Sequence, residues 1–395
     1  MALNLNKTNT QTLSATSLKT YYDRALLENM KPKLVHYEYA QKRILPKNGG
    51  KVVDFRKWTP FDALTTELQE GTVPNGQALS MTNVTATVKS YGGYVSISDV
   101  VDMTSIDPVV TDAVELMADQ GGLSVDTLIR DELHTSTNVL YAGNATDRDG
   151  LASTDVLTMD DIRKAVRQLK NARAPKFNRG GREFYVAVVG PDTVFDLQGD
   201  STWQAVAEYQ DKEKIFSGEI GRIFGVVFVE TTEAKLFGVP AITLPTALKV
   251  SSYSSDDVTV TLSKSLSDAQ ADAIMACGRI KIGDAYFSVA DVDGNEMVLK
   301  AFTGSAPSAN DALALCGPGV TGNTVASTLI FGRNAYGCVD LAGNGNVQSL
   351  VKPAGSSGSC DPLDQITTVG WKVCGFAAKI LQPTWLVRIE HGISA

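Results

Sequence analysis

Residues 107–133 have the sequence DPVVTDAVELMADQGGLSVDTLIRDEL. Asp107 is a favourable helix N-cap, and proline suits the first helical turn that follows it. Spacings of three and four separate the apolar or small residues of one helix face: Val110, Val114, Met117, Gly121, Val125 and Leu128. This periodicity predicts a helix that runs to about Leu133. We expect Gly121 and Gly122 to weaken or bend its middle.

Strand patterns precede this helix. Residues 52–58 (VVDFRKW) and 84–89 (VTATVK) predict two strands, and residues 94–98 predict a third after a break at Gly92-Gly93. Residues 59–83 connect the first two strands and are far more than a compact hairpin turn requires. We therefore expect this loop to project well beyond the domain that carries it.

Mixed helix and strand patterns follow the helix. Thr158 and Asp161 are spaced as a capping pair for a helix that ends near Lys170. A basic loop with Arg173, Lys176, Arg179 and Arg182 leads into an apolar strand at 184–189, and a second apolar strand at 226–229 follows helical sequence around 203–209. The sequence contains no fixed-period repeat.

Residues 250–305 have the pattern of a separate small β unit. Strand patterns lie at 258–262, 279–282, 286–292 and 297–302, and Asp293-Gly294 between the last two is a strong hairpin turn signal. The remaining sequence, 306–395, is again strand-like, with a Gly- and Ser-rich stretch at 355–360.

The composition limits the class of protein. Of the 395 residues, 43% are hydrophobic, which excludes a mainly disordered chain, and the formal net charge of −8 argues against a generic basic nucleic-acid binder. Residues 1–50 differ, with eight Lys or Arg against three Asp or Glu, and with a short helical pattern at 21–30. We expect this arm to lie on an acidic surface of a neighbouring subunit or to face a polyanion; a solvated, frayed terminus is the alternative.

No targeting or membrane signal is present. The first residues lack the apolar core of a signal peptide, and no stretch has the roughly 20 apolar residues that span a bilayer. We therefore expect production in the cytosol of the cell that expresses the chain and no membrane partner.

Signals for catalysis, cofactor binding or metal binding are missing, so we assign no catalytic, cofactor-binding or metal-ligating residue. The histidines, His36, His134 and His391, have no metal-ligand spacing, and the five cysteines lack a C-x-x-C pair. The segment 317–322 (GPGVTG) matches a dinucleotide-binding pattern in letters but lacks its strand and helix context. The segment 291–294 (DVDG) begins like a calcium loop but has Phe302 at the twelfth position, and Asp160-Asp161 suits a helix N-terminus. An enzyme is not indicated.

The charged arm, the long loop, the long helix and the β unit are extensions of a core. Such extensions suit a subunit that reaches over its neighbours in a symmetric assembly.

Short motifs along the chain resemble the major capsid proteins of tailed, podovirus-like bacteriophages. The motifs are KPKLVH at 31–36, AQKR at 40–43, PKNGGK at 46–51, FRKW at 55–58, LQEG at 68–71 with Pro74, TATV at 85–88 with YG at 91–92, SD at 98–99, IDP at 106–108, FGRNAYG at 331–337, DPLDQ at 361–365, TVGWK at 368–372, AAKIL at 377–381 and RIE at 388–390. They are specific in combination and cover roughly residues 1–240 and 325–395.

The resemblance implies an α+β chain with the Hong Kong 97-type capsid fold. Its parts would be an N-terminal arm at 1–50, an extended β-loop at 51–98, a spine helix with peripheral domain at 99–157 and an axial domain at 158–249. Residues 250–305 would be an inserted β unit, and 306–395 would return to complete the axial and peripheral domains.

The implied function is structural. The subunits would assemble through hexamers and pentamers into an icosahedral shell around double-stranded DNA, held by non-specific contact. Portal and decoration proteins are the further partners that the resemblance suggests. The shell would be assembled in the host cytoplasm and would form the capsid of the virion.

Two other readings remain open from the sequence. A cellular nanocompartment shell protein of the same fold would enclose enzyme cargo instead of DNA. A hydrolase with appended β modules belongs to a different class and would need a catalytic acid pair.

Overall fold

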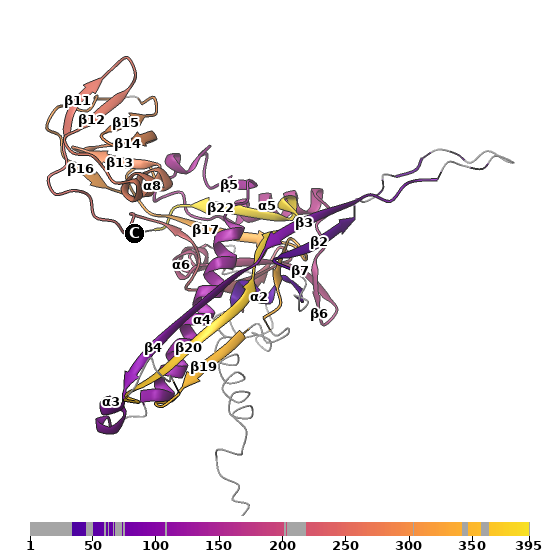
Figure 1. Cartoon of the computed structure of the whole chain (residues 1–395). Helices are drawn as coiled ribbons and strands as arrows, with labels where there is room; N and C mark the ends of the chain where they lie inside the picture. The colour runs from indigo at the N-terminus through magenta and orange to yellow at the C-terminus, as the bar shows by residue number, and fades with distance from the viewer. Residues whose placement is uncertain are drawn as a thin grey trace, which may run out of the picture. The chain divides into compact units, whose positions relative to one another are not determined.

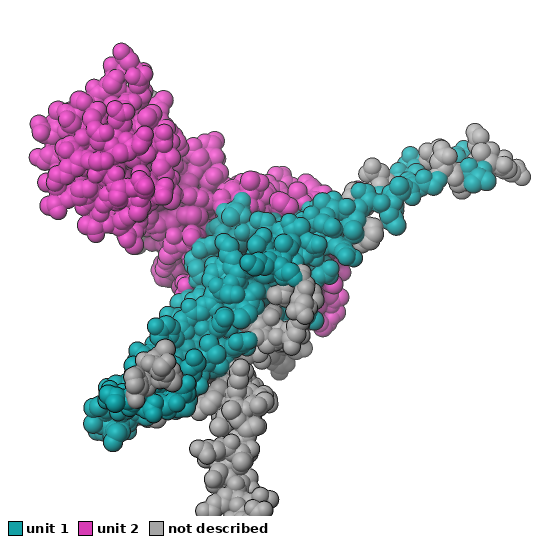
Figure 2. Space-filling view, in the orientation of Figure 1, with its two compact units in different colours: residues 1–135, 334–382 teal, residues 136–333, 383–395 magenta. Residues whose placement is uncertain are grey.

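A computed structural model describes residues 34–44, 50–58, 61, 63–65, 67, 73, 76–106, 109–200, 203, 219–302, 304–341, 347–356 and 363–394. The chain forms two compact units: unit 1 is residues 1–135 and 334–382, and unit 2 is residues 136–333 and 383–395 (Figure 2). Among the helices in these ranges, none is both long and apolar enough to cross a membrane. The predicted helices at 21–30 and around 203–209 and the predicted caps Asp107 and Pro108 lie wholly or mainly outside the described residues.

Unit 1 is built on the long helix α4, Val109–Leu133 (Figure 1). The predicted apolar face is confirmed, since Val114, Gly121 and Val125 are buried. The helix runs without interruption through Gly121 and Gly122, and both glycines are buried. The prediction of the helix end at about Leu133 is also confirmed, and the Nδ1–H group of His134 donates a 2.7 Å hydrogen bond to the Arg130 carbonyl of the last turn.

A three-stranded antiparallel sheet packs on α4. Its strand order is β19 (Val347–Lys352), β20 (Ile366–Phe376), β4 (Lys89–Ser98). Ile97 and Val369 from the sheet form an apolar cluster with Ala113 and Val114 of the helix. The Trp371 indole Nε1 donates a 3.0 Å hydrogen bond to Oε1 of Gln120 on α4. The central strand β20 thus joins the C-terminal part of the chain to the helix and to β4.

The expected strand break at Gly92-Gly93 is wrong, because β4 is continuous from Lys89 to Ser98. These glycines pair with Lys372 and Trp371 of β20. A Cβ atom on Gly92 would lie 2.7 Å from the Trp371 carbonyl oxygen, so the close approach of the two backbones requires glycine there.

Smaller elements complete unit 1. Strands β2 and β3 pair antiparallel over seven residues each, and β1, β18 and β21 form a three-stranded sheet. The bounds are β1 Gln41–Arg43, β2 Val52–Trp58, β3 Met81–Thr87, β18 Tyr336–Val339, β21 Ala378–Ile380, α2 Val35–Glu38 and α3 Asp99–Thr104.

Unit 2 contains an eight-stranded mixed sheet with the order β5-β22-β17-β7-β9-β8, in which β10 also pairs with β17 and β6 with β7. The strands are β5 Val139–Tyr141, β6 Phe177–Arg179, β7 Arg182–Val189, β8 Glu219–Ile223, β9 Val226–Glu230, β10 Leu236–Phe237, β17 Val325–Phe331 and β22 Leu386–His391. The helices are η2 Arg148–Gly150, α5 Met159–Asn171, α6 Pro191–Gln198 and η4 Pro383–Trp385.

Helix α5 covers this sheet and begins at the predicted capping box. The Thr158 hydroxyl and the Asp161 carboxylate bond reciprocally to each other's backbone N–H groups. The buried face of the helix, with Ile162, Val166 and Leu169, joins a core made with the sheet residues Ala187, Val189, Phe228, Ile330, Val387 and Ile389. Because this face is fixed in the core, the charged face of α5 is directed to solvent.

The predicted β unit is a six-stranded antiparallel sheet with the order β11-β12-β15-β14-β13-β16. Its elements are β11 Val250–Ser254, β12 Thr259–Leu262, α8 Asp268–Cys277, β13 Arg279–Ile282, β14 Ala285–Asp293, β15 Glu296–Leu299 and β16 Leu313–Leu315. The Asp293-Gly294 hairpin is confirmed. The sheet reaches ten residues beyond the expected boundary at 305, and it includes a helix, α8, that the strand patterns did not predict.

We predict that replacing residues 244–315 by a short Gly/Ser linker leaves the eight-stranded sheet folded. The six-stranded sheet has a core of its own, whose members all lie between Leu244 and Leu315. Its two ends lie together, because the Leu313 N–H donates to the Leu248 carbonyl at 3.2 Å. Circular dichroism and a cooperative thermal transition of the shortened chain test this; loss of the transition would make the β unit integral to the core of unit 2.

Candidate functional site

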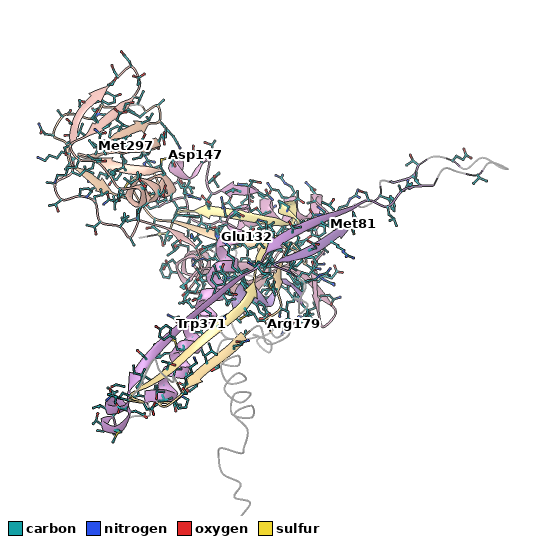
Figure 3. The ribbon with its side chains drawn as sticks, in the orientation of Figure 1. Met81, Glu132, Asp147, Arg179, Met297 and Trp371 are labelled. Carbon is teal, nitrogen blue, oxygen red and sulfur yellow. The ribbon has the colours of Figure 1, made fainter. Side chains whose placement is uncertain are left out.

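Unit 1 has two surfaces with apolar side chains directed to solvent. The first is the β2–β3 pair with the segment that joins its strands. One of its faces is covered, by Val53, Phe55 and Ala86, which are buried. Beyond the pair, the described apolar residues Phe61, Leu64, Val73 and Leu79 are exposed, Val73 to 90%. Met81, the first residue of β3, lies where the pair projects from the rest of unit 1 (Figure 3). Exposed apolar side chains on a projecting segment mark an interaction surface.

Helix α3 provides the second such surface, at the opposite end of unit 1 (Figure 1). Val100, Met103 and Ile106 are exposed, Met103 to 84% and Ile106 completely. Leu363, which is also exposed, precedes Gln365, whose carbonyl accepts a 2.8 Å hydrogen bond from the Asp99 N–H. The two segments therefore lie next to each other, and we call their exposed apolar side chains the α3 patch.

A buried polar cluster fixes the start of the described chain to α4. We call His36, Asp126 and Tyr336 the anchor cluster. Asp126 accepts a 2.8 Å hydrogen bond from the His36 backbone N–H, and its second oxygen lies 2.7 Å from the ring Nδ1 of His36. The Tyr336 hydroxyl donates to the His36 carbonyl at 2.5 Å. Burial raises the pKa of Tyr336 well above its usual value, so the phenol remains a donor.

The projecting strands are held next to this cluster. A Cβ atom on Gly337 would lie 2.5 Å from Cε1 of Phe55, so β18 leaves room for the Phe55 ring only because it has glycine after Tyr336. The Lys57 ammonium donates a 2.5 Å hydrogen bond to Oε1 of Gln382. Asp126 was not predicted as a structural residue, although a carboxylate next to Val125 on the apolar helix face is a signal for a paired, buried acid.

The residues considered for chemistry are placed in separate parts of the fold. His36 belongs to unit 1, whereas His391 is buried in unit 2 between the Thr328 hydroxyl at 3.1 Å and the Gly392 carbonyl at 2.8 Å. Burial lowers the pKa of His391. Within the described ranges, no group of three or more His, Cys, Asp or Glu side chains is arranged to hold a metal ion.

The described cysteines are mainly buried thiols. Burial raises the pKa of Cys316 to about 11 and that of Cys338 to about 12, so both stay protonated near neutral pH. Cys277 donates to the Cys316 carbonyl at 3.1 Å. These groups pack as small apolar side chains, while Cys360 lies outside the described residues.

The Gly-rich segment 317–322 is a closed loop. The Gly317 N–H donates to the Gly322 carbonyl at 2.8 Å, and a strand, β17, follows it in place of the helix that a dinucleotide site requires. Asp160 pairs with Arg163 at 2.9 Å on the first turn of α5, consistent with a helix N-terminus.

Comparison with known families decides the class of this protein. A family model described as phage capsid protein matches residues 125–377, which is more than half of the chain. This chain belongs to the phage capsid protein family. Proteins of that family form the shell of the phage particle, so the chain is a structural shell subunit located in the capsid of the virion. The prediction made from the sequence motifs is confirmed.

Solved structures agree on the fold of this capsid protein. The capsid of Ralstonia phage GP4 superposes with a TM-score of 0.57 at 13% identity, covering 88% of this chain and 85% of that one. The capsid of cyanophage P-SCSP1u gives 0.53 at 12% identity, covering 92% and 89%, and that of cyanophage Pam1 gives 0.53 at 13%, covering 88% and 86%. None of the curated proteins matches the sequence. The chain has the α+β Hong Kong 97-type capsid fold, as expected.

We predict that Asp126→Ala lowers the free energy of unfolding of unit 1 by about 3 kcal/mol, because it leaves the buried His36 N–H and ring nitrogen without their charged acceptor. The matched control is Asp119→Ala, at an exposed position of the same helix, which should change stability by less than about 0.5 kcal/mol. Urea denaturation measures both, and faster proteolysis within residues 34–43 should accompany the first. Equal stability of the two variants would show that the anchor cluster does not stabilise unit 1.

Proposed function

We propose that this chain is the major capsid protein that assembles through hexamers and pentamers into an icosahedral shell around double-stranded DNA. The observation that carries the proposal is family membership over residues 125–377. The role proposed is purely structural, with assembly in the host cytoplasm and with portal and decoration proteins as further partners.

The two exposed surfaces of unit 1 support an assembly role. Closed shells need each subunit to contact several copies, and a subunit that carries apolar groups at both ends of one unit can do so. The projecting segment after β2 contains Phe61, Leu64, Val73 and Leu79 exposed, and the α3 patch contains Met103 and Ile106 exposed. Such side chains gain stabilisation when a neighbouring copy removes them from water.

The roles of the expected parts follow from this proposal. Residues 1–50 would act as the arm, 51–98 as the extended loop over a neighbouring subunit, and 99–157 as the spine helix and peripheral domain. Residues 158–249 would be the axial domain, and 306–395 would return to complete the axial and peripheral domains. The six-stranded sheet, expected at 250–305, would be an insertion on the outer surface. No specific observation favours a nanocompartment or a hydrolase.

The purified protein should form closed shells. Mass photometry and electron microscopy are expected to show species far larger than the 42.2 kDa chain, with five- and six-fold capsomers. A chain that stays monomeric over a wide range of salt and protein concentration would contradict the proposal.

We predict that Leu64→Ser, Val73→Ser and Leu79→Ser, made together, leave a folded subunit that fails to form shells. These side chains are exposed in the described chain, so the subunit loses little of its own packing, whereas contacts with a neighbour lose their apolar part. The control is Leu64→Ile, Val73→Ile and Leu79→Met, which keeps the apolar character. Circular dichroism checks folding and electron microscopy checks assembly; normal shells from the serine variant would exclude the segment from the contact.

A further inference from the structure

One basic segment stands out in this acidic chain. Residues 163–182 contain eight Lys or Arg and no Asp or Glu. The remaining residues carry 28 Lys or Arg against 44 Asp or Glu. We call residues 163–182 the basic segment, and its cations are Arg163, Lys164, Arg167, Lys170, Arg173, Lys176, Arg179 and Arg182.

The charges of the basic segment are available at the surface. All of its cations are exposed except Lys176, which is half-buried. Arg163 and Lys164 pair with the acids just before them, at 2.9 and 2.8 Å, and Lys176 pairs with Glu183 at 3.3 Å. Such exposed pairs contribute at most about 1 kcal/mol and exchange readily. Four cations form no ion pair with any described residue: Arg167, Lys170, Arg173 and Arg182.

The fold fixes the position of these cations. Because Ile162, Val166 and Leu169 are held in the core of unit 2, the opposite face of α5 presents Arg163, Arg167 and Lys170 at spacings of four and three. The segment continues into the β6–β7 hairpin, in which Arg179 and Arg182 are register partners. Figure 3 shows Arg179 at this hairpin.

The β6–β7 hairpin turn has no packed neighbour at its two glycines. Gly180 and Gly181 both have positive φ, 59° and 79°, as a two-residue hairpin turn requires, and a Cβ atom on either would meet nothing within 4 Å. The two arginines therefore flank a turn that has open space around it.

The lack of apolar groups indicates the kind of partner. No large exposed hydrophobic side chain lies in residues 163–182, all of which the structure describes. Protein–protein interfaces have an apolar centre and few lysines, whereas interfaces with nucleic acids are polar and strongly positive. Duplex DNA has one negative charge for about every 1.7 Å of its axis and releases counterions when cations contact its phosphates.

We propose that the basic segment is a binding surface for the phosphate backbone of duplex DNA. The inference rests on the proposed function, in which the shell encloses double-stranded DNA, and it names the surface of the subunit that contacts this DNA. Binding would be independent of base sequence, because the cations on α5 and on the β6–β7 hairpin contact charge and carry no base-reading arrangement.

The test compares two full-length variants that each remove four exposed cations that form no ion pair with a described residue. The first is Arg167→Gln, Lys170→Gln, Arg173→Gln and Arg182→Gln. The matched control is Lys89→Gln, Lys249→Gln, Lys352→Gln and Lys372→Gln, whose side chains are exposed elsewhere. Fluorescence anisotropy measures binding of a 30-base-pair duplex of arbitrary sequence over a salt series, with unassembled subunits confirmed by sedimentation.

The first variant should bind at least about a hundredfold more weakly at 50 mM salt, and the slope of log K against log salt should fall by about 3 to 4. The control should change the slope by less than about 1. Equal losses in both variants, or none in the first, would overturn the proposal. A first variant that binds DNA normally but forms no shells would also overturn it and would assign the surface to contact with a second copy.

Failure of the proposed function gives a different result. If the wild-type subunit binds no duplex and nuclease-treated particles contain no DNA, the DNA-enclosing role fails together with this inference. If the wild type binds and the particles contain DNA while the first variant is unchanged, only the basic segment is excluded.

Discussion

Unit 1 depends on the pairing of β4 with β20. Ser98 pairs with Ile366 and Gly93 with Trp371, so strands more than 260 positions apart in the sequence must meet before the sheet exists. This sheet buries the first part of helix α4, because Ile97 and Val369 form one apolar cluster with Ala113 and Val114. The close approach of the two strands requires glycine at Gly92 and Gly370, where a Cβ atom would meet backbone oxygen at 2.7 and 2.8 Å. The projecting strands and the α3 patch therefore belong to a unit that depends on non-local strand pairing.

In unit 2, the short helix η2 connects the eight-stranded sheet to the six-stranded β unit. Arg148 donates two 2.7 Å hydrogen bonds to the fully buried Glu390 of β22, which fixes η2 to the eight-stranded sheet. The next residue, Asp149, accepts through its carbonyl from Arg279 of β13 at 2.5 Å and through its carboxylate from Lys300, which follows β15, at 3.1 Å. Removing Glu390 would take away the buried carboxylate that holds the half-buried Arg148 guanidinium, a larger loss than that of an exposed pair. Two adjacent residues of opposite charge thus connect the inserted β unit to the sheet that carries it.

Local patterns in the sequence predicted the elements with strong periodicity or clear end signals. The helix face at Val114, Gly121 and Val125, the capping box at Thr158 and Asp161, and the hairpin at Asp293-Gly294 all appear as expected, because each depends on neighbours within a few residues. The break at Gly92-Gly93 was wrong for the opposite reason: glycine there serves a strand partner from the other end of the chain, which no local window contains. Helix α8 was missed inside a region whose strand patterns dominate.

The sequence alone determined the family, the long helix, the strand-rich character of the β unit and the unusual charge of residues 163–182, since these are properties of order and composition. Only the tertiary structure decided that Asp126 meets His36 and Tyr336, that the β unit extends to Leu315, and that four cations of the basic segment form no ion pair with a described residue. These facts depend on which distant groups come within hydrogen-bonding distance of one another. That distance is fixed by strand register and helix packing over the whole unit, so it is absent from any local pattern of residues.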